Sequence, residues 1–215
     1  MKYNTILFDF DGTLTDSSKI ILPCIENTYR ELNLKLPSAS ILHKFIGPPL
    51  RDAFLNIGTP EELVDRAVDI YRGTFNNNRF EDFLLYPGMR NLLEKLKDAG
   101  VRLAVASVRI EDKLQEICMQ MDIERYFETV CGRVDAEAVF TKEDVVRRAL
   151  EKLGHPPGDT ALVGDSVFDE EGARDAGIDF IAVLYGFGFA DASSVGQNVF
   201  IADSVQSVAG FLEIA

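Results

Sequence analysis

Residues 5–16 read TILFDFDGTLTD, an apolar run that passes directly into a group of acidic and small residues. The first four residues have the composition of a buried strand. Alternate residues of a strand point to the same side, so Asp9 and Asp11 can flank one small site just beyond its end. Gly12 then allows the backbone to turn sharply. This arrangement suits a nucleophile beside a proton donor, and a solvated acidic turn is the alternative without function.

The composition bounds the class of protein. A chain of 215 residues, 47% of them hydrophobic, can bury a substantial core, as one domain or as a domain with a smaller one inserted. Its formal net charge of −13 repels nucleic acid and anionic membrane surfaces, so we predict neither as a partner. The chain opens without a secretory stretch, and its three cysteines form no pattern of disulfides or metal ligands. We therefore expect a cytoplasmic protein.

Short apolar runs recur along the chain between segments with helical periodicity. The strand candidates are residues 5–8, 101–106, 129–131, 160–163, 180–184 and 199–201. Several of them are continuous apolar runs, which is typical of strands covered on both faces. The repeated strand-helix order predicts an α/β fold with a doubly wound parallel sheet. Residues 17–85 contain helical patterns and no convincing strand, so we expect an inserted all-helical domain there, with the α/β core formed by residues 1–16 and 86–215.

Two polar residues occupy positions where such a fold places its sites. Ser107 follows an apolar strand, and open α/β sheets bind ligands at the carboxyl ends of their strands. Its hydroxyl can donate to a phosphate oxygen. Lys142 follows the cap candidate Thr141 at the start of a predicted helix, where the helix dipole disfavours a cation, so the lysine points to an anionic partner. An ordinary strand-end serine and a solvated lysine are the alternatives.

A second group of acids follows another predicted strand. Residues 161–169 read ALVGDSVFD. Asp165 can join Asp9 as an oxygen ligand for Mg²⁺, which favours a few carboxylates together with water and phosphate. Asp169 lies four residues further on, near a helix start, where it can receive metal-bound water or orient Lys142. Its alternative role is to interact with the helix dipole.

With these residues together, the chain resembles the haloacid dehalogenase superfamily, in its phosphatase branch with a helical C1 cap after the first motif. DFDGTLTD at residues 9–16, Ser107, Lys142 and GDxxxD at residues 164–169 match the four motifs of the family in order. The whole chain is similar to the phosphoglycolate phosphatase-like group, which includes 5′-nucleotidases, and residues 45–50 resemble its cap loop. Val108 and Arg109 depart from the Asn and Lys that many relatives carry.

The resemblance implies a Mg²⁺-dependent phosphatase that hydrolyses a phosphoglycolate-like ester or a nucleoside monophosphate. Asp9 would form an aspartyl-phosphate, and Asp11 would protonate the leaving group and later accept a proton from water. Ser107 and Lys142 would stabilise the charge of the transferred group. The resemblance implies that Asp9, the Asp11 carbonyl and Asp165 bind Mg²⁺, and that Asp169 has a supporting role. It implies that the phosphate is contacted by Gly12, Thr13, Ser107, Val108, Arg109 and Lys142.

Three other functions fit parts of the same pattern. A phosphosugar mutase shares the scaffold, but such relatives more often carry Val-Ile or Val-Leu where this chain has Thr13 and Leu14. A dehalogenase would lack the second aspartate of the first motif, which is Asp11 here. A non-catalytic phosphate-binding module would be expected to lose a motif acid, and none is missing. The sequence carries no signal for an oligomeric state.

Overall fold

A computed structural model describes residues 2–42, 45, 48, 50–76, 83–134, 140–154 and 159–213 of the chain. The chain divides into two compact units, one formed by Met1–Asp16 with Leu84–Ala215 and the other by Ser17–Phe83. The roles of catalytic core and cap for these units stay predictions. Within the described ranges, no helix combines the length and the apolar character that crossing a membrane requires.

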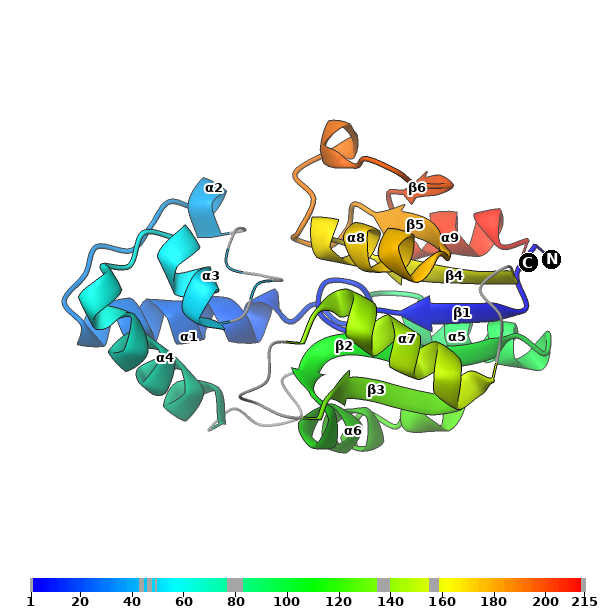
Figure 1. The fold of residues 1–215 in the computed structure, drawn as a ribbon, viewed down its shortest axis with the longest axis horizontal. Coiled ribbons are helices and arrows are strands. Elements are labelled where there is room, and N and C mark those ends of the chain that lie inside the picture. Colours follow the sequence, from blue (N-terminus) through cyan, green and yellow to red (C-terminus); the bar gives the residue numbers. More distant parts are fainter. Residues whose placement is uncertain are drawn as a thin grey trace. The chain divides into compact units, whose positions relative to one another are not determined.

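The first unit is built on a six-stranded parallel sheet (Figure 1). The strands are β1 (Thr5–Phe8), β2 (Arg102–Ile110), β3 (Thr129–Arg133), β4 (Thr160–Gly164), β5 (Asp179–Val183) and β6 (Phe200–Ala202). Their order is β3-β2-β1-β4-β5-β6, so β1 lies between β2 and β4. Phe8, its last residue, is opposite both Val105 and Val163. The predicted doubly wound parallel sheet is confirmed, and the carboxyl ends of three neighbouring strands meet at one edge.

Helices cover both faces of this sheet (Figure 1). They are α5 (Met89–Asp98), α6 (Glu111–Gln120), α7 (Lys142–Leu153), α8 (Val167–Ala176) and α9 (Val205–Phe211), with single 3₁₀ turns at Glu124–Tyr126 and Ala192–Ser194. Helices α7 and α8 pack against each other on one face, and α5 and α9 lie together on the other. All four residues of β1 are buried, because helices cover the sheet on both of its faces.

The starts of α7 and α8 are specified locally. Thr141 accepts a hydrogen bond from the backbone N–H of Asp144, and the Asp144 carboxylate accepts one from the N–H of Thr141. Ser166 and Asp169 form the same reciprocal pair at the start of α8. Such capping boxes satisfy backbone donors that a helix start leaves unpaired. They therefore determine where Lys142 and Asp169 lie along their helices.

Strand β2 is longer than its apolar run predicts. Ser107 was expected to follow the end of the strand, but β2 continues through Ser107 to Ile110. The pairing of β2 with β1 ends at Val105, and the pairing with β3 continues beyond a register shift between Ala106 and Ile110. The backbone of β2 therefore continues to pair with β3 beyond the point where its pairing with β1 ends. Polar side chains at this end of β2 are consequently held on a strand.

The second unit contains only helices among its described residues. They are α1 (Ser18–Glu31), α2 (Ala39–Leu42), α3 (Leu50–Asn56) and α4 (Glu61–Asn76). Phe45, Phe54 and Tyr71 form an aromatic cluster with ring centroids 4.9 to 5.9 Å apart. The Tyr29 and Thr59 hydroxyls share a buried hydrogen bond of 2.7 Å. Residues 46, 47 and 49 of the predicted cap loop lie outside the described residues.

Candidate active site

The site begins with a tight turn directly after β1. The backbone N–H of Asp9 donates to the Val163 carbonyl at 2.9 Å, which holds Asp9 beside the end of β4. The Phe10 carbonyl then accepts hydrogen bonds from the backbone N–H groups of Leu14 and Thr15, at 3.1 and 3.0 Å. The Thr15 hydroxyl donates to the same carbonyl at 3.1 Å. This network folds residues 10–15 into a compact turn at the sheet edge.

Gly12 is required in this turn for two reasons. Its φ of +77° lies in the left-handed region, and a Cβ at this position would overlap the Asp165 carboxylate. The next residue, Thr13, is completely buried, and its hydroxyl has no hydrogen-bond partner among the described residues. The turn therefore places Gly12 against the Asp165 carboxylate and buries Thr13 directly after it.

Lys142 joins two of the predicted acids. Its ammonium nitrogen lies 2.5 Å from Asp9 Oδ1 and 2.6 Å from Asp169 Oδ1, and the three side chains are only 5%, 11% and 2% exposed. The stem of Lys142 passes over Gly172 of α8, where any Cβ would overlap it. Burial by itself would lower the pKa of Lys142, but the carboxylates of Asp169 and Asp9 outweigh burial and raise it. Lys142 is therefore a permanent buried cation.

Asp165 is held by a loop that follows β5. Asp165 Oδ2 accepts hydrogen bonds from the backbone N–H groups of Phe187 and Gly188, both at 2.9 Å. The Phe189 N–H donates to the Asp165 carbonyl at 2.8 Å. A Cβ at Gly186 would overlap the Asp165 side chain, and a Cβ at Gly188 would overlap the Asp165 carbonyl. The loop thus determines the orientation of this carboxylate.

Asp169 has two structural partners. Its Oδ2 accepts hydrogen bonds from the Ser166 N–H at 3.0 Å and the Ser166 hydroxyl at 2.6 Å, while its Oδ1 contacts Lys142 at 2.6 Å. The helix-cap role and the orientation of Lys142 therefore coexist in one side chain. Both oxygens of Asp169 are engaged, which fits a supporting residue better than a metal ligand.

Asp9, Asp165 and Asp169 form a buried carboxylate cluster with one oxygen of each within 4.8 Å of the others. Burial raises the pKa of Asp9 to about 7; Lys142 opposes this shift, and the charges of Asp169 and Asp11 add to it. Burial also raises the pKa of Asp165 well above its ordinary value, with further contributions from Asp169 and Asp9. When its three carboxylates are ionised, the cluster carries more negative charge than Lys142 balances, so it favours the uptake of protons or of an added cation.

Arg109 reaches across from β2 to Asp11. Its Nε donates to Asp11 Oδ2 at 2.5 Å and its Nη2 donates to Asp11 Oδ1 at 2.7 Å, with side chains 15% and 17% exposed. The Arg109 backbone N–H lies 3.4 Å from the hydroxyl oxygen of the buried Ser107. Val108, between them, is partly buried. The sheet thus gathers all the predicted site residues in the first unit, from the ends of β1, β2 and β4 and the starts of α7 and α8.

Sequence reasoning missed the loop after β5 and two tyrosines beside it. The Tyr185 hydroxyl donates to the Thr13 carbonyl at 3.1 Å, and the rings of Tyr185 and Tyr86 meet edge to face at 4.7 Å. Burial raises the pKa of both phenols, and the Asp165 charge adds to the effect. A usable signal was the Gly-Phe-Gly sequence at residues 186–188, directly after a strand at the ligand-binding edge.

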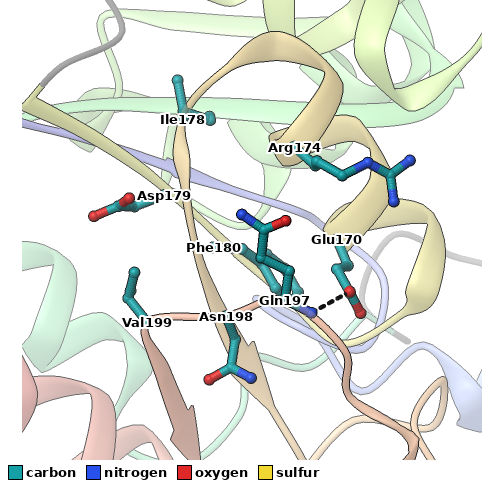
Figure 2. Close-up of a pocket in the computed structure, with 8 residues that line it drawn as sticks. All are labelled: Glu170, Arg174, Ile178, Asp179, Phe180, Gln197, Asn198 and Val199. Atoms are coloured by element: carbon teal, nitrogen blue, oxygen red, sulfur yellow. Dashed lines mark hydrogen bonds between the residues drawn. The ribbon is translucent and has the colours of Figure 1, made fainter.

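A separate small cavity lies beside α8, β5 and the segment before β6 (Figure 2). Its volume is about 60 Å³, room for about two water molecules. Figure 2 shows the Glu170 carboxylate turned toward the backbone of Gln197, and Glu170 Oε1 accepts a hydrogen bond of 2.5 Å from the Gln197 N–H. Glu170 also accepts a hydrogen bond of 3.0 Å from the Gly196 N–H, so its role is to stabilise the chain segment at residues 196 and 197. The cavity does not include the carboxylate cluster.

Comparison with known proteins gives consistent matches. Residues 6–183 match the family described as haloacid dehalogenase-like hydrolase. The chain is 32% identical to a 5′-nucleotidase of Pseudomonas aeruginosa, over 89% of this chain and 87% of that protein. It is 31% identical to a phosphoglycolate phosphatase of Aquifex aeolicus, over 85% of each. The solved structure of a haloacid dehalogenase-like hydrolase from Streptococcus pneumoniae superposes with a TM-score of 0.89 at 29% identity, covering 98% of this chain and 99% of that one.

A further relative has a different name. The chain is 32% identical to the tyrosine-protein kinase PtkA of Mycobacterium tuberculosis over 186 residues, which are 86% of this chain. The chain spans only 64% of the length of that relative. The family match, residues 6–183, covers the sheet from β1 to β5, the helical insertion and the carboxylate cluster together. The chain therefore belongs to the haloacid dehalogenase-like hydrolases.

Proposed function

We propose that the protein is a Mg²⁺-dependent phosphatase that hydrolyses a small phosphomonoester through an aspartyl-phosphate on Asp9. The observation that carries this proposal is the environment of Asp9. One of its oxygens is held by the buried Lys142 ammonium, while its other oxygen has no hydrogen bond or ion pair among the described residues. A carboxylate held in this way is an oriented nucleophile that needs no base. The relatives named as phosphatases and nucleotidases support the same chemistry.

The residues of the site fit Mg²⁺. Asp9 and Asp165 each have one oxygen engaged and one that has no partner in the described part of the chain. Hard carboxylate oxygens from two side chains, with water and substrate phosphate, match the ligands Mg²⁺ prefers. The Asp11 carbonyl is our third proposed ligand. The bound cation would reduce the repulsion between the anionic nucleophile and the anionic phosphate.

The side chains divide the two chemical steps between them. An Asp9 oxygen attacks phosphorus, the bond to the leaving oxygen breaks, and Asp11 protonates that oxygen. In the second step a water attacks the phosphorus of the aspartyl-phosphate, Asp11 accepts its proton, and Asp9 is restored as inorganic phosphate leaves. Lys142 and Ser107 stabilise the oxygens of the transferred group, each contact contributing about 2.7–4 kcal/mol to catalysis. The N–H groups of Thr13 and Val108 are the proposed backbone donors, since the Gly12 N–H already donates to the Thr15 carbonyl at 2.9 Å.

The acceptor of the phosphoryl group separates this proposal from its alternatives. A mutase would pass the group to another hydroxyl of the same sugar, and the relative named as a tyrosine kinase passes it to protein. We propose water as the acceptor. We also propose a cytoplasmic protein without nucleic-acid or membrane partners, since a net charge of −13 repels both.

A panel of phosphomonoesters tests the proposal. Phosphoglycolate, nucleoside 5′-monophosphates and hexose phosphates are incubated with the purified chain, with Mg²⁺ and with EDTA, and inorganic phosphate is measured. We expect Mg²⁺-dependent release of phosphate from at least one of them. An isomerised sugar or a phosphorylated protein without phosphate release would instead identify a transferase. Binding of phosphate without any turnover would identify a non-catalytic module.

The metal-free protein should lose stability as the pH rises. The pKa of Asp9 in the folded protein, about 7, lies above its ordinary 3.8. The contribution of Asp9 to the free energy of unfolding is therefore complete below about pH 4 and is lost as the pH rises through 7. For one proton, the free energy of unfolding falls by up to about 1.4 kcal/mol for each unit of pH. Urea unfolding in EDTA between pH 4.5 and 8 measures it, with Asp9→Asn as the control that lacks this titration. Saturating Mg²⁺ should suppress the slope, and equal slopes for both proteins without metal would contradict the expectation.

Gly188→Ala should weaken Mg²⁺ binding by about 10- to 100-fold, the usual effect of disturbing a residue that orients a metal ligand. The added Cβ would overlap the Asp165 carbonyl and Ser166, so the loop must move and its hydrogen bonds to Asp165 are disturbed. Calorimetric titration of the folded variant with Mg²⁺ measures the loss. Gly210→Ala is the matched control, because a Cβ at Gly210 meets nothing within 4 Å. Unchanged affinity in both variants would remove the loop from the metal site.

A further inference from the structure

We propose that Tyr185 sets the spacing of the Mg²⁺ ligands by joining two parts of the chain that carry them. Asp9 and the Asp11 carbonyl belong to the segment that follows β1, and Asp165 belongs to the segment that follows β4. In this role Tyr185 is a positioning residue and not a ligand. The inference rests on the proposed Mg²⁺-dependent phosphatase, and it assigns the preference for a small cation to a hydrogen bond outside the carboxylate cluster.

The loop after β5 (residues 185–189, the β5 loop) holds Asp165. The backbone N–H groups of Phe187 and Gly188 donate to Asp165 Oδ2, both at 2.9 Å, and the Phe189 N–H donates to the Asp165 carbonyl at 2.8 Å. These bonds fix both the side chain and the backbone of a residue that is only 1% exposed. The position of this proposed ligand is therefore determined by the β5 loop.

Tyr185, the first residue of the β5 loop, reaches the turn after β1. Its hydroxyl donates a hydrogen bond of 3.1 Å to the Thr13 carbonyl. This carbonyl lies within the compact turn of residues 10–15, whose own hydrogen bonds hold it together. The bond from Tyr185 therefore acts on the turn as a whole, and the turn contains Asp11 and directly follows Asp9. One loop thus holds Asp165 through its backbone and the turn through a side chain.

The β5 loop and the turn pack directly against each other. A Cβ at Gly12 would overlap the Asp165 carboxylate, and a Cβ at Gly186 would overlap both that carboxylate and the Gly12 carbonyl. The two glycines thus allow the backbones and the carboxylate to meet. Packing of this kind limits how closely the segments approach, whereas a hydrogen bond also fixes their direction. Tyr185 therefore adds a directional link to a close-packed contact.

Tyr86 keeps the ring of Tyr185 in place. The two rings meet edge to face with their centroids 4.7 Å apart, an arrangement that aromatic pairs prefer. The backbone N–H of Tyr86 also donates to the Leu14 carbonyl at 3.1 Å, so the supporting residue is anchored to the same turn. The phenol of Tyr185 is therefore held at its ring and at its hydroxyl, and it keeps a fixed distance between the β5 loop and the turn.

A fixed spacing of the ligands matters more for Mg²⁺ than for Ca²⁺. Mg²⁺ requires nearly ideal octahedral geometry with oxygens at about 2.0–2.1 Å, whereas Ca²⁺ accepts six to eight oxygens at about 2.3–2.6 Å in flexible geometry. If the bond from Tyr185 is removed, the turn and Asp165 can shift apart slightly. We therefore expect the affinity for Mg²⁺ to fall and the affinity for Ca²⁺ to change little.

Tyr185→Phe tests the inference, because it removes the hydroxyl and keeps the ring against Tyr86. Calorimetric titration of the metal-free protein with Mg²⁺ and with Ca²⁺ measures the two affinities without any substrate. We expect the Kd for Mg²⁺ to rise by about tenfold, the lower end of the usual effect of residues that orient metal ligands. The Kd for Ca²⁺ should change by less than about threefold, because its geometry is more tolerant.

Tyr3→Phe is the matched control in the same unit. The Tyr3 hydroxyl donates a hydrogen bond of 2.6 Å to Asp179 Oδ2, and Tyr3 precedes β1, at the opposite end of the strand from Asp9. Its loss should leave both metal affinities unchanged. Thermal unfolding in EDTA establishes that both variants are folded, so a difference between the ions reports on the site and not on the fold.

The outcomes separate this inference from the function it rests on. Equal weakening of Mg²⁺ and Ca²⁺ binding in Tyr185→Phe would overturn it and reduce Tyr185 to a general support of the fold. Unchanged Mg²⁺ affinity in Tyr185→Phe, or a wild-type protein that binds neither ion, would overturn it as well. A wild-type protein that binds Mg²⁺ but hydrolyses no phosphate compound would refute the phosphatase proposal, while the difference between the two ions would still decide the role of Tyr185.

Discussion

Asp9→Asn protein is expected to lose at least about 10⁴-fold in kcat, the scale found when a covalent nucleophile is removed. The amide oxygen of asparagine is a poor nucleophile, so no aspartyl-phosphate can form and both chemical steps stop. The fold should remain, because the substitution nearly preserves the shape of the side chain and removes one charge from a crowded acidic cluster. Phosphate release under saturating Mg²⁺ measures the loss, and thermal unfolding in EDTA measures the fold.

A second measurement tests the covalent intermediate directly. Rapid acid quenching with a ³²P-labelled substrate should trap a hydroxylamine-sensitive adduct on wild-type protein and none on Asp9→Asn. Asp175→Asn, at a solvent-exposed acid of α8, is the control and should keep full activity. Folded Asp9→Asn protein that retains more than a few per cent of wild-type turnover would exclude Asp9 as the nucleophile.

Lys142→Met is expected to reduce both activity and stability. Methionine has nearly the length of the lysine stem but leaves Asp9 and Asp169 facing each other without the ammonium that now lies 2.5 and 2.6 Å from them. Removal of one partner from a buried ion pair typically costs about 3–5 kcal/mol. Loss of the contact with the transferred phosphoryl group should lower kcat by about 10²–10³-fold. Urea unfolding in EDTA at pH 7.5 and steady-state kinetics with Mg²⁺ measure the two effects separately.

Lys152→Met is the matched control on the same helix. Lys152 pairs with Glu111 at the surface, with side chains 41% and 14% exposed, so its removal should change stability by at most about 1 kcal/mol. The deficit of Lys142→Met should shrink at pH 5, since protonation of one carboxylate relieves the repulsion. A Lys142→Met protein as stable as Lys152→Met at pH 7.5 would show that the buried ammonium does not hold the cluster together.

Much of the site followed from local sequence signals. An apolar run followed by Asp9 and Asp11 indicates a strand that ends in an acidic turn, and the cap at Thr141 indicates where the helix of Lys142 begins. These features depend on neighbouring residues, since strand burial, helix caps and tight turns are determined over a few positions of the chain. The strand-helix alternation likewise predicted the parallel sheet, which in turn predicted that strand ends would gather at one edge.

Contacts between distant segments required the tertiary structure. Arg109 meets Asp11, 98 positions away, and the N–H groups of Phe187 and Gly188 hold Asp165, at separations of 22 and 23 positions. No local pattern contains these pairings, because they depend on the strand order that places β2 and β4 on either side of β1 and β5 beside β4.

The chain on its own therefore determined which residue types stand at the strand ends, because burial and turn formation are short-range properties. Only the folded sheet decided their partners. Lys142 is shared between Asp9 and Asp169, and Arg109 is held by Asp11. Charge interactions depend on distance in space and on exclusion of water, and both arise when the strands have assembled side by side.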